Sequence, residues 1–237
     1  MISPRKIYAI YSKNMKNIIY NPFIMTSPVA ILVLAYLFGA FMIPADAPAE
    51  LTIYLMNMVV IMNAIMCGVM IMSVLIAEEK EKNTLNVLIT STVSGMDFLT
   101  GNVLTTATIT VICNIAVYFI IGARDLIPFG PYILITSAGA AAAITFGATF
   151  GLLAKNQAAA STMAAPLALL IFLPVLLRGS FIIDNVLYYF FTEQISIALV
   201  ELADGKFRLF RIGIITANLI VFAFIFGTCY KKRGFAL

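Results

Sequence analysis

The stretch from Leu51 to Ala77, LTIYLMNMVVIMNAIMCGVMIMSVLIA, contains no charged side chain and is followed at once by EEKEK, Glu78 to Lys82. A helix that crosses a lipid bilayer needs about 20 consecutive apolar residues. An uncharged run of this length therefore predicts a membrane-spanning helix over residues 51–77. The charged residues that follow it, Glu78 to Lys82 (the charged cluster), predict that the helix leaves the hydrocarbon at residue 77.

The composition of the whole chain agrees with this interpretation. Of 237 residues, 62% are hydrophobic and 11% are charged, whereas a soluble domain carries about 25% charged residues. A water-soluble globular protein is therefore excluded. The uncharged run from Leu126 to Ala154 opens with Pro128, Gly130 and Pro131, which favour a turn. We therefore expect the helix of this run to begin near Tyr132. The fold class predicted is an all-α membrane protein in one transmembrane domain, 1–237, with six spans: 23–43, 51–77, 98–122, 132–154, 157–177 and 212–230.

The basic residues predict the orientation of these spans. If the N-terminus is cytoplasmic, ten of the 15 Lys and Arg residues fall on the cytoplasmic side, as expected for multi-pass proteins. We therefore expect a protein of the cell (cytoplasmic) membrane with both termini in the cytoplasm. The net charge of +4 is interpreted as orientation and contact with membrane lipid, and no nucleic-acid partner is expected.

Two further segments are predicted to lie at the membrane surfaces. Residues 3–20 begin with Ser3-Pro4, end before Asn21-Pro22 and alternate apolar and lysine faces, which predicts an interfacial helix, with a frayed basic tail as the alternative. The outer segment 183–204 is apolar but interrupted by three acids, so it predicts two short re-entrant helices, about 183–191 and 193–203, closed by Asp204-Gly205. A disordered outer loop is the alternative.

Several classes of function are disfavoured by what the sequence lacks. It has no histidine, no phosphate-binding GxxxxGK[ST] motif and no ionisable side chain in the middle of a predicted span. Ion-coupled carriers need such groups at membrane depth, and a hydrolase needs a base beside its nucleophile. We therefore expect no enzyme, and no catalytic residue, cofactor or metal site on this chain. The three cysteines lack the paired spacing of metal or disulfide sites.

The segment 78–90 is the most specific local pattern. Glu78 and Lys82 have the favourable i,i+4 order, and Leu85, Leu88 and Ile89 form one apolar edge, which predicts a short amphipathic helix at the membrane face. Such a helix is suited to a groove of a cytosolic partner; a solvated linker is the alternative. Ser94 to Asp97 has the pattern of a capping box that starts the third span.

The stretch Glu78 to Ser94 resembles the signature that follows the second span in permeases of type-2 ATP-binding-cassette (ABC) exporters. Lys13 to Pro28 is similar to that family's approach to the first span, and the predicted layout resembles it along the whole chain. Asn83, Thr92 and Asn102 depart from the Gly, Pro and Lys common at those positions. The resemblance implies that 78–90 is a coupling helix for a separate ATPase, with these contact residues: Glu78, Glu79, Lys80, Glu81, Lys82, Thr84, Leu85, Leu88 and Ile89.

The resemblance also implies a function and partners. The chain would be the permease subunit of an exporter that pairs with a second permease copy or close homologue and with two cytosolic ATPase subunits, which carry ATP and Mg. A hydrophobic or amphipathic substrate (peptide, antibiotic or lipid-like) is expected, with polysaccharide or ions as alternatives. A non-transporting scaffold or sensor that recruits a cytosolic partner is the main rival. An uncoupled channel and an embedded lipid enzyme fit less well, because the chain lacks a charged ring and a base.

Two spacings within the spans carry separate hypotheses. Met58, Met62, Met66 and Met70 recur every fourth residue in the second span; their adaptable thioethers suit either a substrate path or ordinary packing. In the fourth span Gly139, Ala143, Gly147 and Gly151 form a row of small residues that permits close helix approach. We expect that row to pack within the subunit rather than at a dimer seam.

Overall fold

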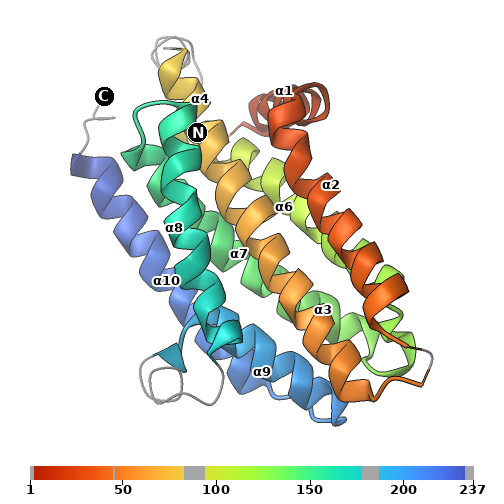
Figure 1. The fold of residues 1–237 in the computed structure, drawn as a ribbon. Coiled ribbons are helices and arrows are strands. Elements are labelled where there is room, and N and C mark those ends of the chain that lie inside the picture. The colour runs from red at the N-terminus through yellow and green to blue at the C-terminus, as the bar shows by residue number, and fades with distance from the viewer. Residues whose placement is uncertain (1–2, 45, 83–93, 178–186, 233–237) are drawn as a thin grey trace.

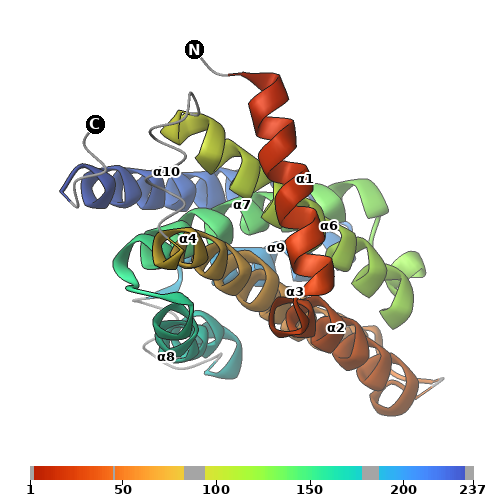
Figure 2. The same cartoon turned by 90° about the horizontal axis from the view of Figure 1, so that it is seen from above.

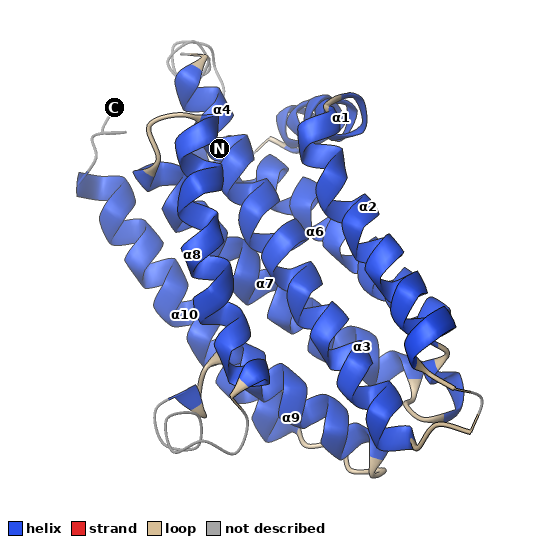
Figure 3. Ribbon diagram, in the orientation of Figure 1, coloured by secondary structure: helices blue, strands red, loops and turns tan. Residues whose placement is uncertain are grey.

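The computed structural model describes residues 3–44, 46–82, 94–177 and 187–232 (Figure 1). All regular structure in these described ranges is helical (Figure 3). The elements, with π-helical and 3-10 segments marked η, are α1 (Pro4–Tyr20), α2 (Pro22–Leu37), η1 (Phe38–Met42), α3 (Ala49–Asn63), η2 (Ala64–Met70), α4 (Ile71–Glu81), α6 (Gly95–Ile121), η3 (Ala123–Asp125), α7 (Phe129–Leu153), α8 (Gln157–Leu176), α9 (Phe191–Ala203) and α10 (Leu209–Lys232).

Five helices in the described ranges are long and apolar enough to cross a membrane. They are Pro22–Met42, Ala49–Glu81, Gly95–Ile121, Phe129–Leu153 and Leu209–Lys231. The chain is therefore an all-helical, multi-pass membrane protein. The fifth predicted span corresponds to α8, which lies beside α4 (Figure 1), but its described apolar stretch, Gln157–Leu173, is shorter. Six spans therefore remain a prediction.

The second span is the centre of the bundle. Its segments α3, η2 and α4 follow one another as a single long helix, and 83% of its most apolar window is buried, against 28% for α2 and 17% for α10. Both ends of the chain, α1 and the end of α4 lie at one end of the molecule, here called the α1 end (Figure 1). The opposite end, where α9 lies and α10 begins, is called the α9 end.

The helix α1 lies across the bundle. It is seen end-on in Figure 1 and along its length in Figure 2, as expected of an interfacial helix. It ends at Tyr20, and Asn21 caps α2 by accepting a hydrogen bond from the Phe23 amide, so the predicted turn at Asn21-Pro22 is confirmed. The side chain of Ser3 makes no cap; its backbone N–H instead donates to Asp97 Oδ1 of α6, across 2.8 Å.

Several helix boundaries differ from those predicted by a few residues, among them those of the second, third and fourth spans. The second span does not end at Ala77 but continues to Glu81, because neighbouring helices bind the charged side chains that follow. The fourth span begins at Phe129 rather than near Tyr132; Pro131 is tolerated in the first turn, where its missing N–H is not needed. The third span begins at Gly95, and the capping box between Ser94 and Asp97 is confirmed.

One of the two helices predicted for the outer segment is present in the described residues. Helix α9 matches the second predicted helix and ends at Ala203, where Gly205 has a φ of 74° that favours glycine. For the first predicted helix, 183–191, residues 183–186 lie outside the described residues. Residues 188–190 form a turn and bend, and Phe191 already belongs to α9. The first predicted helix and the re-entrant course of the pair therefore remain predictions.

The row of small residues in α7 packs within the chain. A Cβ atom added at Gly147 would lie 2.5 Å from the carbonyl oxygen of Val69. A Cβ atom added at Gly151 would lie 2.8 Å from the carbonyl oxygen of Ser73. The Ser73 hydroxyl also donates to the Gly147 carbonyl across 2.8 Å. Further along the row, Ala143 meets Gly68 of η2, and Gly139 meets Ile195 of α9. The absence of side-chain bulk in α7 thus allows the second span to approach it closely.

Candidate functional site at the end of the second span

The charged cluster, Glu78 to Lys82, binds three other helices. Its first two acids contact α1: Asn17 Nδ2 donates to Glu78 Oε2 across 2.8 Å, and Lys13 forms an ion pair with Glu79. Both carboxylate residues are only 6% exposed. A buried carboxylate requires such partners, so α1 and the end of α4 depend on each other.

The next two residues of the charged cluster bind the ends of α7 and α8. Lys80 Nζ donates to the carbonyl oxygens of Leu152, across 2.8 Å, and Ala154, at the C-terminal end of α7. Glu81 Oε2 accepts a hydrogen bond from the Gln157 amide, across 2.9 Å, at the start of α8. A cation at a helix C-terminus and an anion at an N-terminus both complement the helix dipole. One turn of α4 therefore fixes the connection between α7 and α8.

The last residue of the charged cluster, Lys82, points outward. Its Nζ lies 2.5 Å from Glu78 Oε1, and its side chain is 61% exposed. The hydrogen bond to Glu78 raises the pKa of Lys82 above its ordinary value, so the amine stays charged at neutral pH. The i,i+4 pair predicted between these residues is confirmed.

The structure thus gives the nine predicted coupling residues different surroundings. Glu78, Glu79, Lys80 and Glu81 all have partners on other helices of this chain. Thr84, Leu85, Leu88 and Ile89 lie outside the described residues. The described part of the predicted coupling segment is therefore bound largely by other helices of this chain.

The helix α1 also contacts α6, the span that follows residues 83–93. Asn14 Nδ2 donates to Asn102 Oδ1 across 2.7 Å, and both side chains are buried. Next to this pair, Ile10 packs closely on Gly101. A Cβ atom added at Gly101 would lie 2.6 Å from a methyl group of Ile10. Sequence reasoning missed Asn14 and Asn17 as site residues. Both residues lie on the inward side of α1, among its apolar positions, and this placement is the sequence feature that could have identified them.

The methionine row is the exposed edge of the second span. Between Leu55 and Glu79 all side chains are buried except Met58, Met62, Met66 and Met70, which are half-buried. Met66 and Met70 line a small pocket of about 90 Å³ with residues of α2, among them Phe23 and Ser27. The row therefore lies on an open face of the central helix, beside α2.

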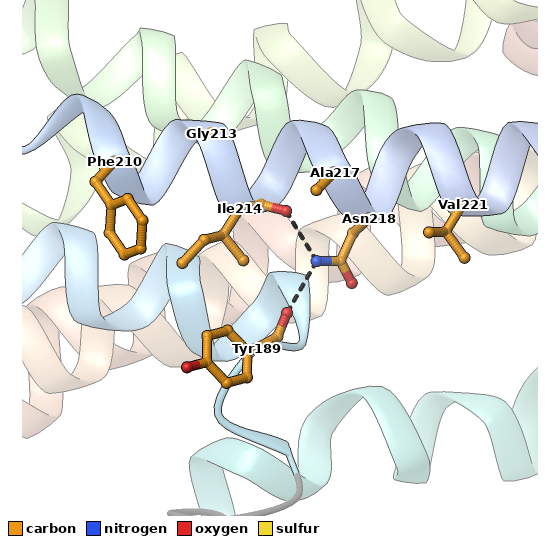
Figure 4. Close-up of a pocket in the computed structure, with 7 residues that line it drawn as sticks. All are labelled: Tyr189, Phe210, Gly213, Ile214, Ala217, Asn218 and Val221. Carbon is orange, nitrogen blue, oxygen red and sulfur yellow. Dashed lines mark hydrogen bonds between the residues drawn. The ribbon is translucent and has the colours of Figure 1, made fainter.

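A larger pocket of about 520 Å³ lies at the α9 end, on α10 (Figure 4). Asn218 Nδ2 donates there to the carbonyl oxygens of Tyr189 and Ile214, across 2.8 and 2.9 Å. The rest of the lining is apolar apart from the Tyr189 phenol, so the pocket offers no acid–base pair for catalysis. Its lining residues are Tyr189, Phe210, Gly213, Ile214, Ala217, Asn218 and Val221.

The α9 end has its own buried charge network. Arg211 of α10 is 7% exposed and donates to Glu201 Oε1 (2.8 Å), the Tyr188 hydroxyl (2.8 Å) and Gln194 Oε1 (3.1 Å). The hydrogen bond from Arg211 holds the pKa of Glu201 below its ordinary value. This network ties α9 to the start of α10. Sequence analysis did not single out Arg211.

In the described ranges no group of three or more His, Cys, Asp or Glu side chains is placed to hold a metal ion. A comparison of the sequence with known families found no matching family model, and a comparison with curated proteins found no match.

Proposed function

We propose that this chain is the membrane-spanning permease subunit of a type-2 ABC exporter, driven by two separate cytosolic ATPases that bind ATP and Mg. The observation that carries the proposal is the set of contacts of the charged cluster. In one turn, α4 binds α1, the end of α7 and the start of α8. A subunit that receives force from a partner needs such a junction, whereas an independent channel does not.

The proposed route of force follows the chain. Residues 83–90 leave α4 at Lys82, and α6 begins at Gly95, so displacement of this segment acts on the ends of two spans. The helix α1 contacts both of them, through Lys13 and Asn17 on α4 and through Asn14 on α6. ATP-driven movement of the segment would therefore tilt α4 and α6 together with α1.

The methionine row supports a position for the cargo path. It is the open face of an otherwise buried central helix, and thioethers repack around varied apolar shapes. We place a hydrophobic or amphipathic substrate, and the second permease copy, on this face. The proposal includes α8 as the sixth span, and it includes cytoplasmic termini, because the α1 end carries Lys13, Lys80 and Lys155 among its basic residues.

The experiment is affinity purification of the tagged chain from membranes of its source cells, followed by an assay of vanadate-sensitive ATP hydrolysis. Hydrolysis that co-elutes with the wild-type chain and is lost in Leu85→Asp/Leu88→Asp supports the proposal. Lys155→Asp, a change of charge on the α7–α8 connection, is the matched control and should retain activity. Recovery of a partner without ATP hydrolysis would favour the scaffold interpretation instead.

A further inference from the structure

A pocket of about 360 Å³ lies between the second half of α1 and the end of α4. Three lysines and two glutamates line it: Lys13, Lys16, Lys82, Glu78 and Glu79, with Asn17 and Tyr20 completing the wall. Because Lys13 pairs with Glu79 and Lys82 pairs with Glu78, the two carboxylates are each matched by one amine. One positive charge is left over.

That charge belongs to Lys16. Within the part of the chain that the structure describes, Lys16 has no carboxylate partner, and its side chain is exposed. The segment that leaves α4 at this point, residues 83–93, contains no acidic residue in its sequence. Lys13 and Lys82 also keep more than half of their side-chain surface exposed, at 54% and 61%. The pocket therefore offers a ligand with negative charge one amine that has no carboxylate partner among the described residues, flanked by two paired amines that remain partly exposed.

The position of the pocket along the second span indicates which kind of anion can reach it. Glu78 and Glu79 lie in the last turn of a membrane-spanning helix, so the pocket is at the level where hydrocarbon gives way to headgroups. Tyr20 and Ile19, at the adjoining end of α1, are 82% and 56% exposed. The amphipathic ring of a tyrosine is favoured at the membrane interface, and an exposed isoleucine beside it can contact acyl chains. The phosphate of a lipid whose acyl chains lie beside α1 reaches this level directly.

We infer that this pocket binds the phosphate of an anionic phospholipid headgroup, with Lys16 as the main charged contact and Lys13 and Lys82 as supporting donors. Because the bound phosphate would share Lys13 with Glu79, lipid would adjust the contact between α1 and α4. The inference requires only that the chain lies in a membrane, and it stands whether or not an ATPase drives the protein.

The experiment measures retention of phosphatidylglycerol, compared with phosphatidylcholine, by the purified full chain after delipidation and exposure to mixed-lipid vesicles. Lys16→Gln removes from the pocket the amine that has no carboxylate partner in the described ranges, so it should lower phosphatidylglycerol retention about fivefold, which corresponds to about 1 kcal/mol. Lys16→Arg should restore it. Lys155→Gln removes one exposed charge from the same end of the molecule, outside the pocket, and should leave retention within about 1.5-fold of wild type.

An equal loss of phosphatidylglycerol retention in Lys16→Gln and Lys155→Gln would overturn the inference, because it would show diffuse attraction. The absence of any preference for phosphatidylglycerol in the wild-type chain would also overturn it. A parallel arm adds inorganic phosphate at millimolar concentration. Displacement of the lipid in wild type, absent in Lys16→Gln, supports the phosphate as the recognised group. Tight binding of inorganic phosphate to the delipidated chain without any lipid preference would assign the pocket to free phosphate, against the lipid site inferred here.

Discussion

The side-chain amide of Asn17 on α1 donates a hydrogen bond to Glu78 Oε2 at the end of α4, across 2.8 Å. One turn earlier on α1, Lys13 forms an ion pair with Glu79. These contacts join an interfacial helix to the end of the central span, at the point where the predicted docking segment leaves the bundle. In the proposed mechanism these contacts would make α1 part of the path along which force is transmitted.

Reversing one charge of the Lys13–Glu79 pair should destabilise the α1 end. In Lys13→Glu, the buried Glu79 carboxylate loses its amine partner and faces a like charge. We expect the free energy of unfolding to fall by about 1–2 kcal/mol, which is less than for a fully buried pair because the lysine is half exposed. Thermal unfolding in detergent measures the change. The double variant Lys13→Glu/Glu79→Lys should recover part of the loss, and equal destabilisation in single and double variants would contradict the pairing.

The Asn14–Asn102 hydrogen bond predicts a different mutational pattern. Both amides are buried, so Asn14→Leu leaves Asn102 with an unsatisfied oxygen and should cost about 1–3 kcal/mol. Asn14→Leu/Asn102→Leu removes both polar groups and should cost less than the two single changes together. Unfolding transitions of the three variants test this, and strict additivity would show that the two amides do not interact.

The close approach of α7 to the second span predicts that Gly147 tolerates no side chain. Because an added Cβ would lie 2.5 Å from a backbone oxygen of Val69, Gly147→Ala should force the helices apart and cost about 1–3 kcal/mol. The matched control is Gly227→Ala, whose added Cβ has no neighbour within 4 Å. Its unfolding temperature should be unchanged or slightly raised. Similar losses in both variants would point to a general effect of glycine replacement.

The ion pair between Glu201 and Arg211 predicts a dependence of stability on pH. Since Arg211 lowers the pKa of Glu201 below 4.5, the stabilisation is fully present above pH 4.5 and is lost as pH falls through the lowered folded-state pKa. Glu201→Gln should therefore lower the unfolding temperature at pH 7 and flatten its fall toward pH 3. A wild-type and variant difference that is independent of pH would rule out this contribution.

The sequence alone predicted the local features well and the long-range contacts poorly. Uncharged runs, the Asn21-Pro22 turn and the Ser94–Asp97 capping box follow from neighbouring residues, and the structure contains them. The roles of the charged cluster did not follow from its spacing. Glu78 contacts a residue 61 positions away, and Lys80 one 72 positions away, while helical periodicity relates only residues within a few turns. The sequence alone therefore predicts that the charged cluster is free to bind a partner protein.

The central claim is that movement of residues 83–90 passes through the charged cluster into α1. The most direct measurement is the distance between spin labels at Tyr8→Cys on α1 and Asp204→Cys at the α9 end, both exposed positions. It is made in a Cys229→Ser chain purified with the ATPase that the proposal requires. We predict that ATP with vanadate changes this distance by about 2 Å or more, that Lys13→Glu abolishes the change, and that Lys13→Glu/Glu79→Lys restores it. An unchanged distance while the bound ATPase hydrolyses ATP would contradict the account.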